Sequence, residues 1–412
     1  MLAVLLRAMG GGSQRGLRRS NRAAVIDELR GRGPLTRAEL ATYTGLSRTT
    51  VSNLLGDLIE RGMVADGDEP AVAADGPRAS GRPSRKVRLD VSAGVAVSVD
   101  IGARHLAVAI GDLGHRVLAR RWIPLEHGHD VESGLEAASG LVDELLAEAG
   151  VERRFVIGTA VGLPAPITQP DEIVASSNIL PGWAGVRLAN ELTQRLEMTA
   201  VVDNDANLGA LAEAKWGAGA GGEQVAYIKV ATGIGAGLIH EGRLFRGVAG
   251  TAGEIGHMTV AEDGPVCRCG NRGCLELYAG GEAILSAVQQ SEPDVETVDR
   301  LVDLALEGDQ RCKRVIADSG RHIGVAIASL VNLLGPDRVV VGGELSRADE
   351  ILLDPLRTAV SRSAVQAAHE AVEIVGGELG PDAEVLGGLL LVITEPWRFG
   401  ADQLLSRLVP DV

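Results

Sequence analysis

Hydrophobic residues in the first ninety positions recur at helical spacing in three short segments separated by glycines. The pattern predicts three helices, over Asn21–Arg30, from the capping residue Thr36 to Tyr43, and from Ser47 up to Gly62. A short second helix, a glycine turn and a third helix with one apolar face are the parts of a helix-turn-helix. We therefore predict a DNA-binding domain at this end of the chain.

When the apolar face of the third predicted helix packs inward, four polar residues of its first turns face outward. Recognition helices contact base edges from such positions, so we predict this role for Arg48, Thr49, Ser52 and Asn53. The chain then becomes rich in glycine and proline before a basic run over 81–88. We expect this run, which includes Arg82 and Arg85, to form a wing that contacts phosphates or the minor groove; a solvated linker is the alternative.

After residue 90 the pattern changes to strands. Three strand-like runs, Gly94–Ile101, His105–Gly111 and His115–Pro124, predict an antiparallel meander, and helix and strand patterns then alternate to Val202. A second meander begins at Val225 and is again followed by helices and a strand. This repeated order resembles that of two-lobed sugar kinases and actin-type ATPases, whose ligands lie in the cleft. We therefore expect an α/β fold of two lobes.

Charge divides the chain at the same point. Residues 1–90 carry 15 Lys and Arg against 10 Asp and Glu, whereas the remaining residues carry 25 against 45. A basic head on an acidic body indicates that the head binds a polyanion, and double-stranded DNA is the partner we predict. No apolar run approaches the roughly 20 residues of a spanning helix, and the first residues lack the features of a secretion signal, so we expect a cytoplasmic protein without a membrane partner.

Three of the four cysteines fall within eight residues, and a histidine precedes them. Three thiolates and one imidazole form a ligand set typical of structural zinc, and four protein ligands leave no open position for a metal-bound water. We predict that His257, Cys267, Cys269 and Cys274 bind structural zinc; the alternative is an accidental cluster. Cys312 is expected to be a buried bystander.

Carboxylates and an amide recur near the ends of predicted strands, at Asn204-Asp205, in Glu254–His257 and at Glu276. Such groups suit bidentate hydrogen bonding to the neighbouring hydroxyls of a sugar. Taken separately, each is more typical of a helix cap or a solvated charge, so the interpretation depends on the whole group.

The chain from about Val91 to Thr394 resembles the ROK family, named for repressors, open reading frames and kinases. Seven motifs carry the resemblance in chain order: Asp100–Gly102, Ser177–Trp183, Asn204–Asn207, Thr232–Gly237, Gly253–His257, Cys267–Glu276 and Val341–Glu344. The resemblance implies a sugar site formed by Asn178, Asn204, Asp205, Glu254, His257 and Glu276, in which Asp205 matches the general base of the family's kinases. It also implies the zinc site, and zinc would hold the loop that presents Glu254 and Glu276.

The family's nucleotide loops correspond to Asp100, Gly102, Thr232, Gly233 and Gly235, but both loops depart from the kinase pattern. Kinases of the family have Asp-x-Gly-Gly-Thr-Lys in the first loop, whereas this chain has Ala103, Arg104 and His105 after the first glycine. The second loop opens with Ala231 in place of glycine. A Cβ can obstruct the close approach of phosphate to backbone N–H groups, so these loops are predicted to be vestigial and count against ATP and magnesium.

These features predict five segments and one leading function. The segments are an N-terminal extension over 1–19, a winged helix-turn-helix over 20–90, lobe 1 over 91–204, lobe 2 with the zinc knuckle and a C-terminal helix returning to lobe 1 over 205–396, and a tail over 397–412. The predicted function is a sugar-responsive transcriptional regulator, a repressor of carbohydrate metabolism genes, acting as a homodimer or homotetramer on an operator. The alternatives are an ATP-dependent ROK sugar kinase and a bifunctional protein that phosphorylates its sugar slowly.

Overall fold

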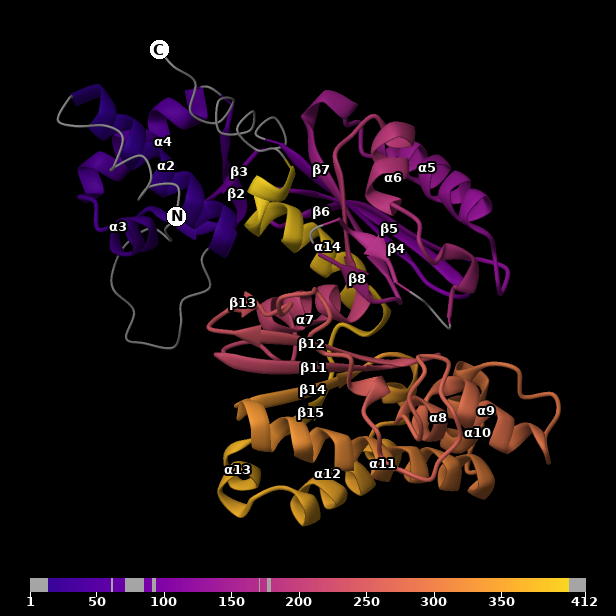
Figure 1. Ribbon diagram of the computed structural model, residues 1–412. Helices are drawn as coiled ribbons and strands as arrows, with labels where there is room; N and C mark the ends of the chain where they lie inside the picture. The colour runs from indigo at the N-terminus through magenta and orange to yellow at the C-terminus, as the bar shows by residue number, and fades with distance from the viewer. Residues whose placement is uncertain are drawn as a thin grey trace.

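The computed structural model describes residues 14–60, 62–70, 85–90, 94–169, 171–175 and 179–399. A small helical head lies beside the upper of two stacked α/β lobes (Figure 1). The head begins with α2 (Gln14–Arg32), α3 (Arg37–Thr44) and α4 (Arg48–Glu60). The first helix is longer than predicted at both ends, because residues 14–20 are mostly polar and give no apolar repeat to read.

Local capping determines where α3 begins and ends. The Thr36 hydroxyl accepts a hydrogen bond from the Glu39 backbone N–H, and the Glu39 carboxylate accepts one from the Thr36 N–H, at 3.2 and 2.7 Å. This is the predicted capping box. Gly45 ends the helix in the left-handed region, with φ of 67°, which glycine adopts without strain. The helix-turn-helix prediction is confirmed.

A small antiparallel sheet completes the head. It comprises β1 (Leu35–Thr36), β3 (Arg85–Leu89) and β2 (Val64–Pro70), in the order β1-β3-β2. The pairing of β2 with β3 forms the wing of a winged helix. Residues 71–84, which include Arg82, lie outside the described residues.

Lobe 1 contains a five-stranded sheet in the order β10-β7-β4-β5-β6. Its central strand β4 is buried along its whole length, because both faces of the sheet are covered. Helices α5 (Val131–Glu148) and α6 (Leu188–Leu196) lie over one face, and α14 (Ala383–Thr394) packs on the other (Figure 1). The strands are β4 (Val95–Ile101), β5 (His105–Asp112), β6 (Val117–Pro124), β7 (Val156–Leu163) and β10 (Ala200–Asn204).

Lobe 2 repeats this plan with the sheet β13-β12-β11-β14-β15. Helix α7 (Asp205–Trp216) lies on the face that looks toward lobe 1, and the remaining helices cover the opposite face (Figure 1). The strands are β11 (Gln224–Val230), β12 (Ile234–His240), β13 (Arg243–Leu244), β14 (Arg338–Gly342) and β15 (Glu373–Gly376); the other helices are α8 (Glu276–Ala279), α9 (Gly281–Gln289), α10 (Val298–Glu307), α11 (Gln310–Leu334), α12 (Glu350–Ser363) and α13 (Gln366–Ala371).

Helices α7 and α14 pack against each other between the two sheets. Glycines allow this close approach: a Cβ at Gly387 would lie 1.8 Å from the Leu208 carbonyl oxygen, and one at Gly388 would lie 2.0 Å from the Ser98 hydroxyl. The molecule therefore has the predicted two-lobed actin-like ATPase and sugar-kinase fold behind a winged helix-turn-helix. Within the described residues, the helices are too short or too polar to cross a bilayer.

Candidate ligand cleft, metal centre and DNA-binding surface

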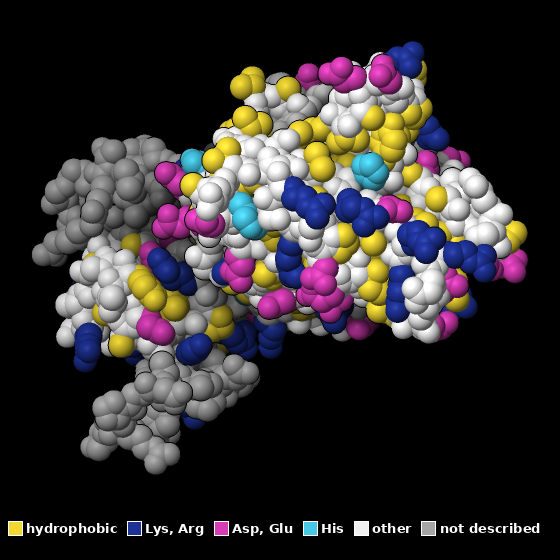
Figure 2. Space-filling view, turned by 90° about the horizontal axis from the view of Figure 1, so that it is seen from below, with side chains coloured by type: hydrophobic (Ala, Val, Ile, Leu, Met, Phe, Trp, Pro, Cys, Tyr) yellow, Lys and Arg dark blue, Asp and Glu magenta, His cyan; other side chains and the backbone are white. Residues whose placement is uncertain are grey.

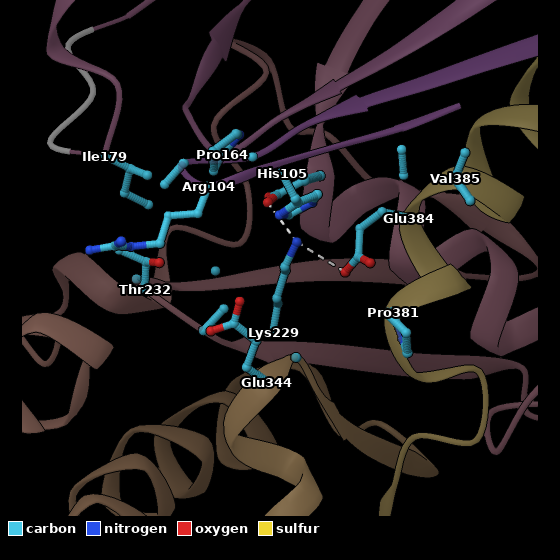
Figure 3. Close-up of a pocket in the computed structure, with 18 of the residues that line it drawn as sticks. Arg104, His105, Pro164, Ile179, Lys229, Thr232, Glu344, Pro381, Glu384 and Val385 are labelled. Atoms are coloured by element: carbon cyan, nitrogen blue, oxygen red, sulfur yellow. Dashed lines mark hydrogen bonds and ion pairs between the residues drawn. The ribbon is translucent and has the colours of Figure 1, made fainter. Parts of the chain in front are cut away.

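A cleft of about 750 Å³ separates the two lobes. It is lined by the ends of strands and the loops that follow them, from both lobes (Figure 3). The lining contains all the predicted sugar ligands that the structure describes: Asn204, Asp205, Glu254, His257 and Glu276. Asn178 lies outside the described residues, and Ile179, which follows it, lines the cleft.

Asn204 and Asp205 stand where β10 ends and α7 begins. The Asn204 side-chain oxygen caps α7 by accepting the Ala206 N–H at 2.9 Å, and its amide donates to the Ala165 carbonyl at 3.1 Å. One carboxylate oxygen of Asp205 also accepts the Ala206 N–H, at 2.7 Å. A carboxylate at a helix N-terminus is favoured by the helix dipole. The start of α7 therefore places both side chains at the cleft.

Lys229 of β11 is a cleft residue that sequence reasoning missed. Its ammonium lies 2.8 Å from the second carboxylate oxygen of Asp205 and 3.1 Å from a carboxylate oxygen of Glu384 in α14 (Figure 3). Burial opposes the charge on Lys229, but Asp205 and Glu384 outweigh it and hold its pKa well above the usual range. Each oxygen of Asp205 therefore has a partner within the protein, the Ala206 N–H on one and the Lys229 ammonium on the other.

The side chain of His105 covers the first loop, which contains Asp100 and Gly102. His105 Nε2 donates to the Asp100 carboxylate at 2.9 Å, and a Cβ on Gly102 would lie 2.2 Å from that ring. Burial raises the pKa of Asp100, but the neighbouring His105 and Lys229 outweigh it and lower that pKa. Asp100 therefore lies beneath the cleft with His105 as its partner. The imidazole lies over Gly102, and whether this loop is vestigial as a phosphate site stays a prediction.

The second loop joins β11 to β12 and contains Thr232 and Gly233. A Cβ on Gly233 would lie 2.8 Å from the Glu276 carboxylate, whose oxygen also accepts the Ile234 N–H at 3.3 Å. Gly235 faces the Ala206 side chain of α7, which a Cβ would approach to 3.3 Å. These glycines therefore bring Glu276 against the loop and β12 against α7, and this packing accounts for them without a nucleotide.

Three carboxylates converge on the cleft. Burial, together with the negative charges of Asp205 and Glu276, raises the pKa of Glu254 to about 7. Such a site has acceptors for several hydroxyl groups, as a polyhydroxylated ligand requires. Lys229 and Arg104 also line the cleft, so carboxylates are not its only charged groups.

The predicted zinc ligands meet at one point beside the cleft. The ligand atoms of His257, Cys267, Cys269 and Cys274 all lie within 4.8 Å of one another. The sulfur atoms of Cys269 and Cys274 are 3.6 Å apart, and the Cys267 sulfur lies 3.9 Å from His257 Nδ1. Zinc–sulfur bonds of about 2.3 Å in a tetrahedron require ligand separations of about 3.8 Å, so the residues fit this metal.

His257 connects the metal cluster to the cleft. Its Nδ1 faces the cysteines, whereas its Nε2 lies 4.0 Å from the Glu254 carboxylate. The two roles predicted for His257, at the metal and at the ligand, are therefore compatible, because each uses a different ring nitrogen. Cys312 is buried in α11 outside the cluster, as expected.

The predicted base-reading residues are all exposed on one side of α4: Arg48, Thr49, Ser52 and Asn53. The opposite side of the helix is buried through Val51, Leu54, Leu55 and Leu58. Figure 2 shows Lys and Arg side chains at the left of the molecule, with acidic side chains among them.

The basic side chains of the wing do not all face solvent. Arg85 is exposed on β3, as a DNA contact requires, and Arg82 lies outside the described residues. Arg88 instead lies 3.4 Å from the Asp112 carboxylate of lobe 1. Arg88 therefore pairs with a buried acid of the body, and the DNA contacts predicted for Arg82 and Arg85 stay predictions.

Comparison with known families decides between the kinase and regulator branches. The sequence profile of the ROK family matches residues 96–395. The chain belongs to the ROK family. The profile of the MarR family matches residues 15–72, which include the helix-turn-helix. The ROK domain thus follows a MarR-type winged helix, and the predicted resemblance is confirmed.

Three relatives that cover both the head and the ROK domain are named as regulators. A xylose repressor of Caldicellulosiruptor bescii is 28% identical over 396 residues, 93% of this chain and 98% of the relative. The DNA-binding transcriptional dual regulator NagC of Escherichia coli K12 is 30% identical over 374 residues, 87% and 89% of the two chains. The crystal structure of a ROK family transcriptional regulator, a homologue of the E. coli MLC protein, matches with a TM-score of 0.72 at 25% identity, covering 96% of this chain and 100% of that one. The class supported is a ROK transcriptional regulator rather than an enzyme.

Proposed function

We propose that the protein is a sugar-responsive transcriptional repressor whose head binds an operator and whose cleft binds a monosaccharide. The observation that carries this proposal is the ion pair of Lys229 with Asp205, at 2.8 Å inside the cleft. A kinase needs this carboxylate free to accept a proton and needs a donor phosphate in line with it. In this chain Lys229 pairs with that carboxylate and the His105 ring lies over the glycine of the first loop, which supports a regulator over a kinase. The exposed face of α4 supplies a function that a kinase does not need.

The effector we propose is a neutral monosaccharide held by Asn204, Asp205, Glu254, His257 and Glu276, with Asn178 as a further ligand. The convergence of Asp205, Glu254 and Glu276 supports a ligand that donates several hydroxyl hydrogen bonds. The relatives named for xylose and N-acetylglucosamine suggest which sugars to test first. Zinc is the metal that we propose for the Cys₃His cluster, with a structural role, since all four ligands come from the protein.

We propose a homodimer or homotetramer as the operator-binding form. Helix-turn-helix proteins read two half-sites with two heads, and a sugar that changes the spacing or orientation of these heads changes operator affinity. The operator would then be a palindrome, which selection from random DNA with the purified protein would reveal.

A thermal-shift screen tests the effector and separates the two branches of the family. Sugars are added with and without ATP and magnesium, because a ligand that binds only the native state raises Tm. We expect one monosaccharide to raise Tm and to lower affinity for the selected operator, with no further shift from ATP. ADP release at roughly 1–100 per second in a coupled assay would instead establish the kinase alternative.

The DNA-binding surface has its own test. Arg48→Ala is expected to weaken binding to the selected operator by about 1–3 kcal/mol, because a bidentate contact to a base edge is lost. Arg85→Ala, and Arg82→Ala with it, should weaken binding to all sequences and reduce its salt dependence. Arg362→Ala, at an exposed arginine of α12, is the matched control and should leave binding unchanged. Equal affinity of Arg48→Ala and wild type would exclude α4 as the reading helix.

A further inference from the structure

The body of the protein supplies hydrogen-bond donors to the last turn of the head helix α2. The Lys215 ammonium donates to the Gly31 carbonyl at 2.6 Å, and His115 Nε2 lies 2.5 Å from the Arg30 carbonyl oxygen. The last carbonyls of a helix have no partner within it and carry the negative end of the dipole. Lys215 and His115 therefore cap α2 from a different domain and hold the head against lobe 1.

His115 is presented by a turn that also holds the wing. The fully buried carboxylate of Asp112 accepts the backbone N–H groups of Gly114 and Arg116, which shapes the turn between β5 and β6. The same carboxylate pairs with Arg88 of β3 at 3.4 Å. His115 itself adopts the left-handed region, with φ of 69°. Helix α2 and the wing strand thus contact the body through one junction.

Lys215 and Trp216 are the last two residues of α7, and Asp205 is its first. One helix of 12 residues, about 18 Å long, therefore runs from the ligand cleft to the head junction. Every residue from Asp205 to Glu213 is buried, because α7 packs along most of its length against β11, β12 and α14. A helix packed in this way moves as a rigid body rather than bending.

Space for such a movement exists at the junction end of α7. A partly open pocket of about 220 Å³ lies beside it, lined chiefly by the apolar side chains of Trp216, Leu386, Leu389 and Ile393, and also by His115. The Trp216 ring meets the His115 ring edge to face, with centroids 5.5 Å apart. Tightly packed interiors resist displacement, whereas an open pocket beside a large side chain permits a second packing arrangement.

We propose that α7 couples the cleft to the head, and that Lys215 and His115 are positioning residues for operator binding. A sugar hydroxyl that binds Asp205 competes with Lys229 for its carboxylate, which shifts the first turn of α7. The last turn shifts with it and withdraws the donors from the carbonyls of Arg30 and Gly31. The head then loses the orientation that the operator requires. This inference rests on the proposed function and adds the route by which the sugar acts.

The test uses full-length protein, the selected operator and the sugar identified by thermal shift. Lys215→Met removes the donor and keeps the length of the side chain, Lys215→Arg retains a donor, and Lys313→Met removes a lysine of α11 in lobe 2. We expect Lys215→Met to weaken sugar-free operator binding by roughly fivefold or more and to abolish most of the further loss caused by sugar. Sugar affinity should be higher, because binding no longer has to break the cap. Lys215→Arg should restore the response, and Lys313→Met should match wild type.

Hydrogen exchange supplies a readout that a merely structural role of Lys215 would not move. In wild type, sugar should increase deuterium uptake in the peptide covering the end of α2; in Lys215→Met, uptake should already be high and insensitive to sugar. A Lys215→Met protein with wild-type operator affinity and wild-type sugar response overturns the inference. If wild type itself shows no sugar response, it is the proposed function that is wrong, which is a different result from failure of the coupling through α7. A Lys215→Met protein that no longer binds sugar would also overturn it, since the cap would then be needed for the cleft itself.

Discussion

The two sides of the cleft hold their carboxylates in different ways. Glu254 and Glu276 flank a loop whose cysteines and histidine lie within 4.8 Å of one another, so a metal can clamp that side permanently. Asp205, on the other side, is held by Lys229, which a ligand hydroxyl can replace. The metal side is suited to recognising the ligand in one geometry. The lysine side is suited to changing when the ligand arrives, and it is the side that continues into α7 and the head.

The largest expected effect comes from breaking the metal side. Cys269→Ser should remove zinc, destabilise the loop by on the order of 5–10 kcal/mol and abolish sugar binding, since structural zinc and folding of its loop are linked. Elemental analysis and calorimetry measure both results. Cys312→Ala, at a buried cysteine outside the cluster, is the control and should keep the metal. Wild-type protein purified without zinc, yet binding sugar, would refute a clamp of this kind.

Breaking the lysine side should have the next largest effect. Lys229→Met leaves Asp205 and Glu384 buried without their cation, so the free energy of unfolding should fall by about 3–5 kcal/mol. Adding Glu384→Gln should recover part of the loss, because one uncompensated charge disappears. Urea unfolding monitored by fluorescence compares these variants with Lys313→Met. Equal stability of Lys229→Met and wild type would mean that this ion pair contributes nothing.

A smaller effect is expected from replacing single carboxylates of the cleft, and it separates the contribution of Asp205 from that of Glu254. Asp205→Asn should weaken sugar binding by about 1.5–3 kcal/mol, because a hydrogen bond to a charged group is lost. Glu254→Gln should have a smaller effect near neutral pH, since burial raises the pKa of Glu254 to about 7 and much of it is already neutral. Titration calorimetry at pH 7 gives both values. A larger loss of sugar affinity for Glu254→Gln than for Asp205→Asn would show that the more important charge lies on the metal side.

The smallest expected effect lies at the far end of α7. Burial, with the nearby charge of Lys215, lowers the pKa of His115 to about 4. The neutral ring therefore contributes stability that is complete above the unfolded value of about 6.5 and is lost as the pH falls toward 4. The loss amounts to about 1.4 kcal/mol at pH 5.5. The stability difference between wild type and His115→Gln should shrink by that amount between pH 7.5 and 5.5. A constant difference would show that the ring does not titrate in this range.

Features that depend on neighbouring residues could be predicted from the sequence. The capping box of Thr36 and Glu39, the buried face of α4 and the cysteine cluster all use residues fewer than twenty positions apart. The repeated meander predicted the two lobes, because hairpins leave a local pattern. Whether the predicted ligands bind a sugar stays a prediction, and so does each base contact of the head.

Features built from distant residues could not be predicted in the same way. Lys229 and Glu384 are 155 positions apart, and Lys215 and Gly31 are 184 apart, so no local spacing links them. One signal was available for Lys229: the chain has only four lysines, and this one interrupts the otherwise apolar strand Gln224–Val230. A lysine in such a position needs a buried acid, but the sequence does not say which. The basic run that contains Arg88 favoured a contact with DNA, and only the fold reveals that Arg88 pairs with Asp112.

The place of α14 in the fold has a consequence for synthesis of the chain on the ribosome. Among the described residues this helix is the last long element to be made, yet it covers a face of the sheet formed by the first strands of the body, with Gly388 against Ser98 of β4. Lobe 1 therefore exposes an apolar surface until Ala383–Thr394 has emerged, whereas the described elements of the head end at Leu89. A chain truncated before Ala383 would carry a folded DNA-binding head on an incomplete sensor. Nascent and prematurely terminated chains are for this reason the forms most prone to aggregate and to occupy DNA without control.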